Sequence, residues 1–315
     1  MAEEKGFKTL DEQIGVLRQH NIIVSNETSA RSILEFDNYY CIVNGYKDPF
    51  LDKVAGASKD FYKNGTTLEQ IWALFLFDRD LRRVLLQPLL LIEHHVATTI
   101  AYEFSRQYGH HDDSYLRPEN FDPDPRKGRG VTATIEKLKE DINIHRNDQH
   151  ISHYLNDHQY IPLWVLVNVV SFGQLSKFYA NMRQADRNSV ARHFLVREEI
   201  LESFLSVLSQ FRNQCAHNSR TYSYKARPYA IRATPLHSSL SLPTNKDGKC
   251  IVGLNDILAV LICTRILCGR STAEETVQDL DSLLSTLKSE LATVSIGDVT
   301  ARMGLPDNWQ EVCSS

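Results

Sequence analysis

A very long helical pattern, from Leu68 to Tyr108, constrains the fold of this chain more than any other feature. Apolar residues recur along it at intervals of three and four, the spacing of one face of an α-helix. Thr66 or Thr67 can cap its start, since a hydroxyl there accepts a bond from a free N–H of the first turn. Pro88 lacks an N–H, so we expect it to kink the helix or split it, with a second piece from Leu89 to Tyr108. A rod of this length favours an architecture of packed helices.

The rest of the chain repeats this periodicity, and few segments alternate in the manner of β-strands. We therefore predict an all-α fold. Further helices are expected over residues 8–20, 27–40, 131–158, 161–170, 174–182, 253–268 and 272–294. The segment 161–170 looks the most apolar and is predicted to be the central buried helix. Proline and glycine mark loops over 117–130 and 219–250. Loops as long as 219–250 tend to be functional or mobile.

Composition excludes several classes of protein. The 315 residues are 42% hydrophobic and 23% charged, as in an ordinary globular protein, and the net charge of −4 gives no global field for duplex DNA. We expect no signal peptide and no membrane span, because polar residues interrupt the apolar stretches. The six cysteines form no CxxC motif and are expected to be free thiols in a cytoplasmic protein. No metal site and no cofactor are predicted, since the histidine pairs lack a ligand spacing such as HExxH.

One helix carries a residue that does not fit its surroundings. Leu201, Phe204, Leu205, Leu208, Phe211 and Cys215 form an apolar stripe. At about 100° per residue, Arg212 lies about 20° from Leu201, inside that stripe. A guanidinium there needs a carboxylate, a carbonyl, a phosphate or a second copy of the chain. His217 lies about 140° from Arg212, so either the helix ends near this pair or two chains contribute to one site.

Spacing alone does not single out this pair. Arginine followed after four to six residues by histidine also occurs at Arg106/His111, Arg146/His153, Arg187/His193 and Arg232/His237. Charge favours Arg212 and His217, because residues 203–246 contain six basic residues and no acidic ones. Tyr222, Tyr224 and Tyr229 within that strip could stack on bases, which suits single-stranded RNA. The alternative is a solvated basic loop whose tyrosines pack on the body.

Several blocks of sequence together resemble a known family. They are Asn38-Tyr39-Tyr40 with Gly45-Tyr46, Phe77 to Arg82, Ile92-Glu93 with Ile100 to Tyr102 and Tyr108-Gly109, Pro162 to Trp164 with Ser171 to Ser176, and Arg212-Asn213 with Ala216-His217 and Arg220. In this order, over roughly residues 8 to 270, the chain resembles the Abi-like abortive-infection proteins of bacteria, of the AbiD/AbiF type, whose core is similar to the HEPN helical domain. It departs from them at Pro88, and at Asn218, where the family often has a second histidine.

The resemblance implies a function and a division of the chain. It implies a metal-independent endoribonuclease that acts as a homodimer in phage defence and leaves 2′,3′-cyclic phosphate and 5′-hydroxyl ends. RNA would be the substrate, with a small antitoxin or guide-like RNA, or an antitoxin protein, as a further partner. The division would be an N-terminal helical extension over 1–65, a HEPN-like core over 66–270 and a C-terminal helical segment over 271–315.

Residue roles follow from the resemblance and from the charges. Arg212 and His217 would be catalytic, with Asn213 as their polar companion. The supporting or RNA-binding residues would be Glu93, Asn218, Arg220, Lys225 and Arg227. Glu93 would pair with Arg212, hold the ring of His217, or simply be exposed.

Other residues are expected to be structural. Asp78 and Arg82 should form a salt bridge within one helix, and Tyr222 and Trp164 are interpreted as packing residues. Two alternatives to the nuclease stay open, namely a module that binds RNA or a protein without cleavage, and a regulator that only dimerises.

Overall fold

The computed structural model describes residues 6–52, 61–111 and 113–314, and this part of the chain is built from helices. The α-helices are α1 (Leu10–Gln19), α2 (Glu27–Asp37), α3 (Leu68–Tyr108), α4 (Gly128–Ile144), α5 (Gln149–His153), α6 (Leu163–Leu166), α7 (Phe172–Asn181), α8 (Gln184–Arg192), α9 (Glu198–Ala216), α10 (Pro235–Ser239), α11 (Ile257–Leu267), α12 (Arg270–Glu290) and α13 (Ile296–Met303). Short π-helical and 3₁₀ segments connect them, and the described residues form isolated β-bridges but no strand. The predicted all-α class is confirmed.

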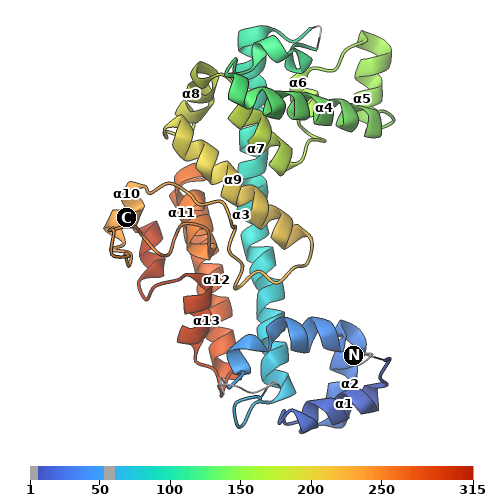
Figure 1. Cartoon of the computed structure of the whole chain (residues 1–315), viewed down its shortest axis with the longest axis vertical. Helices are drawn as coiled ribbons and strands as arrows, with labels where there is room; N and C mark the ends of the chain where they lie inside the picture. Colours follow the sequence, from blue (N-terminus) through green and yellow to red (C-terminus); the bar gives the residue numbers. More distant parts are fainter. Residues whose placement is uncertain (1–5, 53–60, 112, 315) are drawn as a thin grey trace.

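Helix α3 is the axis of the molecule (Figure 1). Its 41 residues span about 60 Å at 1.5 Å per residue. It runs through Pro88 without interruption, so the predicted split into two helices is wrong. Pro88 is buried, and α9, α11 and α12 pack along the rod. This burial and packing of the rod outweigh the loss of one backbone hydrogen bond.

By length and composition, α3 is also apolar enough to cross a membrane, and 56% of its most apolar window is buried inside the protein. The expectation of no membrane span stays a prediction.

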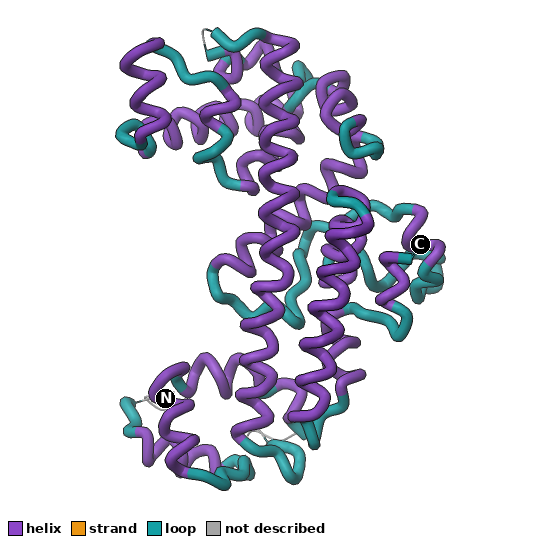
Figure 2. Tube along the Cα trace, turned by 180° about the vertical axis from the view of Figure 1, so that it is seen from behind, coloured by secondary structure: helices purple, strands orange, loops and turns teal. Residues whose placement is uncertain are grey.

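The other helices gather around α3 at three levels, as both views show (Figures 1 and 2). Helices α1 and α2 lie near its N-terminal end, and α4 to α8 surround its C-terminal end. In between, α9, α11 and α12 pack against the middle of the rod. The proposed boundaries after residues 65 and 270 stay predictions, and α12 lies directly against α3.

Some predicted helices differ from those in the structure. The segment 161–170 contains only the four-residue α6 and is not the central helix. That description fits α3, and α11 is the helix buried on nearly all sides. The predicted helix 131–158 begins earlier, at Gly128, and is interrupted after Ile144. Helix α8 was not expected, because its sequence is mostly polar.

Local capping explains where α3 and α7 begin. Thr67 caps α3 by accepting a bond from the Gln70 N–H. Ser171 and Gln174 form a capping box that starts α7, at the predicted break after residue 170. Gln174 also donates to Asp141 of α4 at 2.7 Å, so the same residue that ends the capping motif ties α7 to α4.

Candidate functional site

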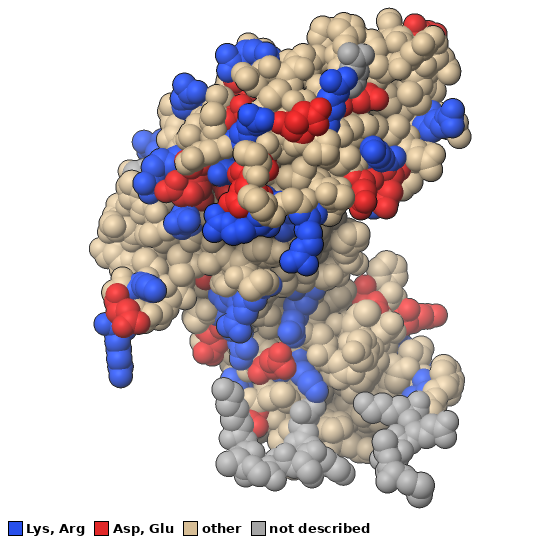
Figure 3. Space-filling view, turned by 45° about the horizontal axis from the view of Figure 1, so that its top comes forward, with Lys and Arg blue, Asp and Glu red and all other residues tan. Residues whose placement is uncertain are grey.

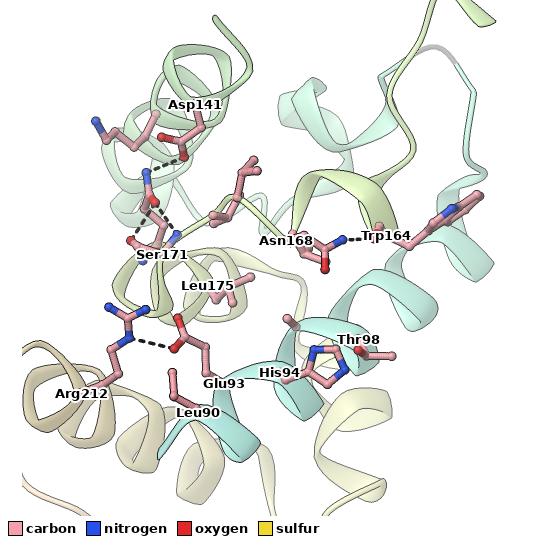
Figure 4. A pocket seen from close by; sticks show the side chains of 16 residues that line it. Leu90, Glu93, His94, Thr98, Asp141, Trp164, Asn168, Ser171, Leu175 and Arg212 are labelled. Carbon is pink, nitrogen blue, oxygen red and sulfur yellow. Dashed lines mark hydrogen bonds and ion pairs between the residues drawn. The ribbon is translucent and has the colours of Figure 1, made fainter. Parts of the chain in front are cut away.

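Arg212 lies on α9 and faces α3. Its Nε donates to Oε2 of Glu93 at 2.8 Å, and the two side chains are 28% and 14% exposed. The anion that an arginine in an apolar stripe requires is therefore a carboxylate of the central helix. Of the roles considered for Glu93, the pairing with Arg212 is confirmed. The bond uses Nε, and Figure 4 shows the Arg212 guanidinium beside the Glu93 carboxylate.

This ion pair borders a cleft of about 710 Å³. Its walls come from α3, α4, α6, α7 and α9, and include Glu93, His94, Asp141, Trp164, Asn168 and Arg212. Figure 4 shows Arg212 and Glu93 on one side of the cleft and Trp164 on the other. Burial raises the pKa of Asp141 above its usual range, although Gln174 donates to it. The cleft is thus lined by a cation, carboxylates, an imidazole and an indole.

His217 lies outside this cleft, at the C-terminal end of α9. It is the C-cap of α9, its backbone N–H bonds to the carbonyl of Asn213, and it is exposed. It does not line the cleft that Arg212 borders. Since α9 is helical up to Ala216, the angular separation of about 140° between Arg212 and His217 is preserved. One chain therefore does not direct both side chains into the same cleft.

A buried network holds the segment that follows His217. Asp78 on α3 is fully buried and binds Arg82 at 2.9 Å, as the sequence predicted. Its carboxylate also accepts bonds from the backbone N–H groups of Thr221 and Tyr222. Tyr46 donates a further bond through its hydroxyl at 2.6 Å. We call Asp78, Arg82, Tyr46, Thr221 and Tyr222 the Asp78 network.

Asn218 is attached to the Asp78 network. Its side-chain oxygen accepts a bond from Nη2 of Arg82 at 2.7 Å, and Nη1 of Arg82 donates to the carbonyl of Ser219. Asn218 has φ 56°, in the left-handed region that asparagine tolerates better than most residues. The position where the family often has a second histidine therefore turns the chain at the end of α9. The helical spacing predicted the Asp78–Arg82 pair. It did not predict the hydrogen bonds that join this pair to the segment 218–222.

The basic strip is partly neutralised within the chain. Arg220 donates to the Gly45 carbonyl at 2.6 Å and to Asp48 at 3.1 Å. Lys225 pairs at 3.2 Å with Asp256, which also caps α11. Arg227 is exposed. Figure 3 shows lysine and arginine side chains gathered across the middle of one face, where the surface is hollowed.

The aromatic residues divide between packing and exposure. Tyr222 is fully buried and stacks on Tyr46, so its interpretation as a packing residue is confirmed. Trp164 is 45% exposed at the wall of the cleft, so the same interpretation was wrong for it. A four-residue helix that follows a proline leaves the indole at the surface, which hydrophobicity alone does not predict.

Two of the other arginine–histidine pairs contain a residue that is buried and makes structural hydrogen bonds. Arg187 is buried and donates to the carbonyls of Ala180 and Met182. His237 is 3% exposed and completes a capping box with Thr234. Among the described residues, no group of three or more His, Cys, Asp or Glu side chains could hold a metal ion.

Comparison with known proteins gives one match. A family model described as Abi-like protein matches residues 32–223, more than half of the chain. The matched range contains Glu93, Arg212 and His217, and it is narrower than the 8–270 expected from sequence blocks. No curated protein and no solved structure shows significant similarity to the chain. The AbiD/AbiF type and the HEPN-like core stay predictions. The chain therefore belongs to the Abi-like protein family, and this membership suggests a role in abortive infection.

Proposed function

We propose that this protein is a metal-independent RNA endonuclease that acts as a homodimeric effector in abortive infection. The observation that carries the proposal is the placement of Arg212. Its guanidinium borders a solvent-accessible cleft and is oriented by Glu93 through a bond to Nε, and in this proposal its Nη groups bind the anion. A planar guanidinium of this kind suits a phosphate.

The reaction divides between the two side chains. His217 removes the proton of the 2′-hydroxyl, whose oxygen attacks the phosphorus and displaces the 5′-oxygen. The protonated imidazole then gives that proton to the departing 5′-oxygen, which leaves a 2′,3′-cyclic phosphate and a 5′-hydroxyl. Arg212 stabilises the charge that develops on the non-bridging oxygens, an effect commonly worth a few kcal/mol.

A second protomer explains the geometry. Because Arg212 and His217 of one chain face different directions, the partner subunit's His217 would complete the site at the Arg212 cleft. Asn213 is half-buried on α9 between the two residues, and its carbonyl bonds the His217 N–H. In this proposal Asn213 orients His217 at the end of the helix.

Cleavage of a labelled single-stranded RNA tests the proposal. Arg212→Ala and His217→Ala should each abolish cleavage, and the products of the unaltered protein should carry 2′,3′-cyclic phosphate ends. Arg129→Ala and His150→Ala are matched controls, because both side chains are exposed and lie outside the cleft and outside the basic strip. Intact RNA with the unaltered protein would refute the proposal.

Mixing the two inactive variants tests the shared site. An equal mixture of Arg212→Ala and His217→Ala chains should recover about a quarter of the activity, since half of the dimers are mixed and each mixed dimer has one complete site of two. No recovery in exchanged dimers would show that each chain uses its own Arg212 and His217.

A second candidate function follows from the same separation of side chains. If no partner completes the cleft, Arg212 is an anion-binding residue, and the protein is a module that binds RNA or a protein without cleavage. RNA that stays intact but bound, with binding lost in Arg212→Ala, would support this alternative.

A further inference from the structure

A group of exposed rings begins at the wall of the cleft opposite Arg212. Trp164 lines the cleft, is 45% exposed, and lies with its ring centroid 5.6 Å from that of His110. His110 is 4.0 Å from His111, and His111 is 4.7 Å from Tyr160. We call these four residues the aromatic track.

The fold holds the aromatic track in place. His110 and His111 follow the end of α3, whereas Tyr160 precedes α6 and Trp164 lies within it. Buried Tyr115 connects these segments, because its hydroxyl donates to the carbonyl of Ile161 at 2.8 Å. The rings therefore meet through the tertiary packing of two segments that lie far apart in the sequence.

The position of the aromatic track relates it to the cleft. Figure 4 shows Trp164 and Arg212 at opposite sides of one cavity, with the Asn168 side chain donating to the backbone carbonyl of Trp164. Both histidine rings of the track are exposed, and Tyr160 is half-buried. His153 is left out of the track, because its ring contacts Asp157 at 2.7 Å and the carboxylate would repel a phosphate backbone.

We propose that the aromatic track binds bases of single-stranded RNA that flank the phosphate held at Arg212. Every base offers a π-face to an aromatic ring, and such stacking tolerates any sequence. Duplex RNA does not fit, because its bases are already stacked inside the helix. Since Arg212 and Trp164 lie on opposite sides of the cleft, the stacked bases are separated from the cleaved linkage by intervening nucleotides. This inference rests on the proposed function for the role of Arg212.

Binding by a cleavage-deficient chain tests the track. In the full-length His217→Ala background, fluorescence anisotropy would give the Kd of a labelled 20-nucleotide single-stranded RNA. Trp164→Ala should raise this Kd about tenfold, within the range that loss of one stacked base produces. Trp164→Phe should restore most of the affinity, and His111→Ala should weaken binding independently of the cleft wall.

Two RNA controls identify the contact as stacking. An abasic strand of the same length keeps the phosphates, so Trp164→Ala should leave its Kd unchanged. A duplex RNA of the same length has its bases already stacked inside the helix, so Trp164→Ala should leave its Kd unchanged as well. Phe36→Ala is the matched protein control, because Phe36 is 84% exposed on α2, remote from the cleft in the fold.

The outcomes separate the track from the nuclease. The proposed track would be overturned if the Trp164→Ala chain and its His217→Ala parent bound the 20-nucleotide RNA with the same Kd. It would also be overturned if Trp164→Ala raised the Kd for abasic RNA by the same factor, or if the parent did not bind the RNA. Cleavage by the unaltered protein is measured separately and decides the proposed function. Stacking in a protein that leaves RNA intact would keep the track and refute the nuclease.

Discussion

Removal of the Asp78 carboxylate should destabilise the protein more than any exposed substitution on α3. The side chain is 0% exposed and accepts bonds from Tyr46, Arg82 and the N–H groups of Thr221 and Tyr222. In Asp78→Ala these donors lose an acceptor. The Arg82 guanidinium, 5% exposed, keeps only the oxygens of Asn218 and Ser219.

The magnitude follows from the broken ion pair. Removing one partner of a buried, hydrogen-bonded pair costs about 3–5 kcal/mol, against a total stability of roughly 5–15 kcal/mol for a typical domain. With a urea m-value of about 3 kcal/mol/M, a loss of about 4 kcal/mol lowers the midpoint of unfolding by roughly 1.3 M.

Urea unfolding followed by circular dichroism measures this shift. Asp80→Ala is the matched control, because Asp80 lies on the same helix and makes only a 3.9 Å contact with Arg79. Its effect should stay below about 0.5 kcal/mol. The double variant Asp78→Leu/Arg82→Met should be more stable than Asp78→Ala, since it leaves no unpaired charge. If Asp78→Ala and Asp80→Ala unfold at the same urea concentration, the reasoning about the Asp78 network is refuted.

Two further predictions concern the cleft and the response to pH. Glu93→Gln should lower kcat for RNA cleavage roughly tenfold with little change in KM, because the loss of the charged bond to Arg212 disturbs the orientation of the guanidinium. The control is Glu140→Gln, since Glu140 is an exposed glutamate near the cleft. An unaltered kcat in Glu93→Gln would contradict the role of Glu93. Burial lowers the pKa of His237, so the folded protein keeps this ring neutral while the unfolded chain takes up a proton below about pH 6.5. The unfolded state then binds more protons, and stability falls as the pH drops below that value. His237→Gln should show a smaller loss of Tm between pH 7.5 and pH 5.5 than the unaltered protein, and equal losses would argue against the assignment.

Much of the secondary structure was predictable, because helical periodicity and capping are local. The spacing of apolar residues located α3, α9 and α11, and Thr67 was one of two expected caps. The misplacement of Arg212 in an apolar stripe also predicted an anionic partner, since an unpaired guanidinium is costly at such a position. These features depend on residues close together in the chain or on the chemistry of one side chain.

Other features depended on segments far apart in the chain. Pro88 is tolerated because helices remote in sequence pack beside it. Trp164 is exposed because α6 ends after one turn at the edge of the cleft. The aromatic track exists because the end of α3 meets the segment before α6, and no sequence spacing encodes that meeting.

The chain's local chemistry thus settled its helical class, its principal rod and the need of Arg212 for an anion. Tertiary packing alone chose Glu93 as that anion and placed Trp164 on the opposite wall of the cleft, with three further rings beside it. The physical reason is that periodicity reports which face of a helix is buried, whereas the identity of the group that buries it depends on contacts across the whole fold.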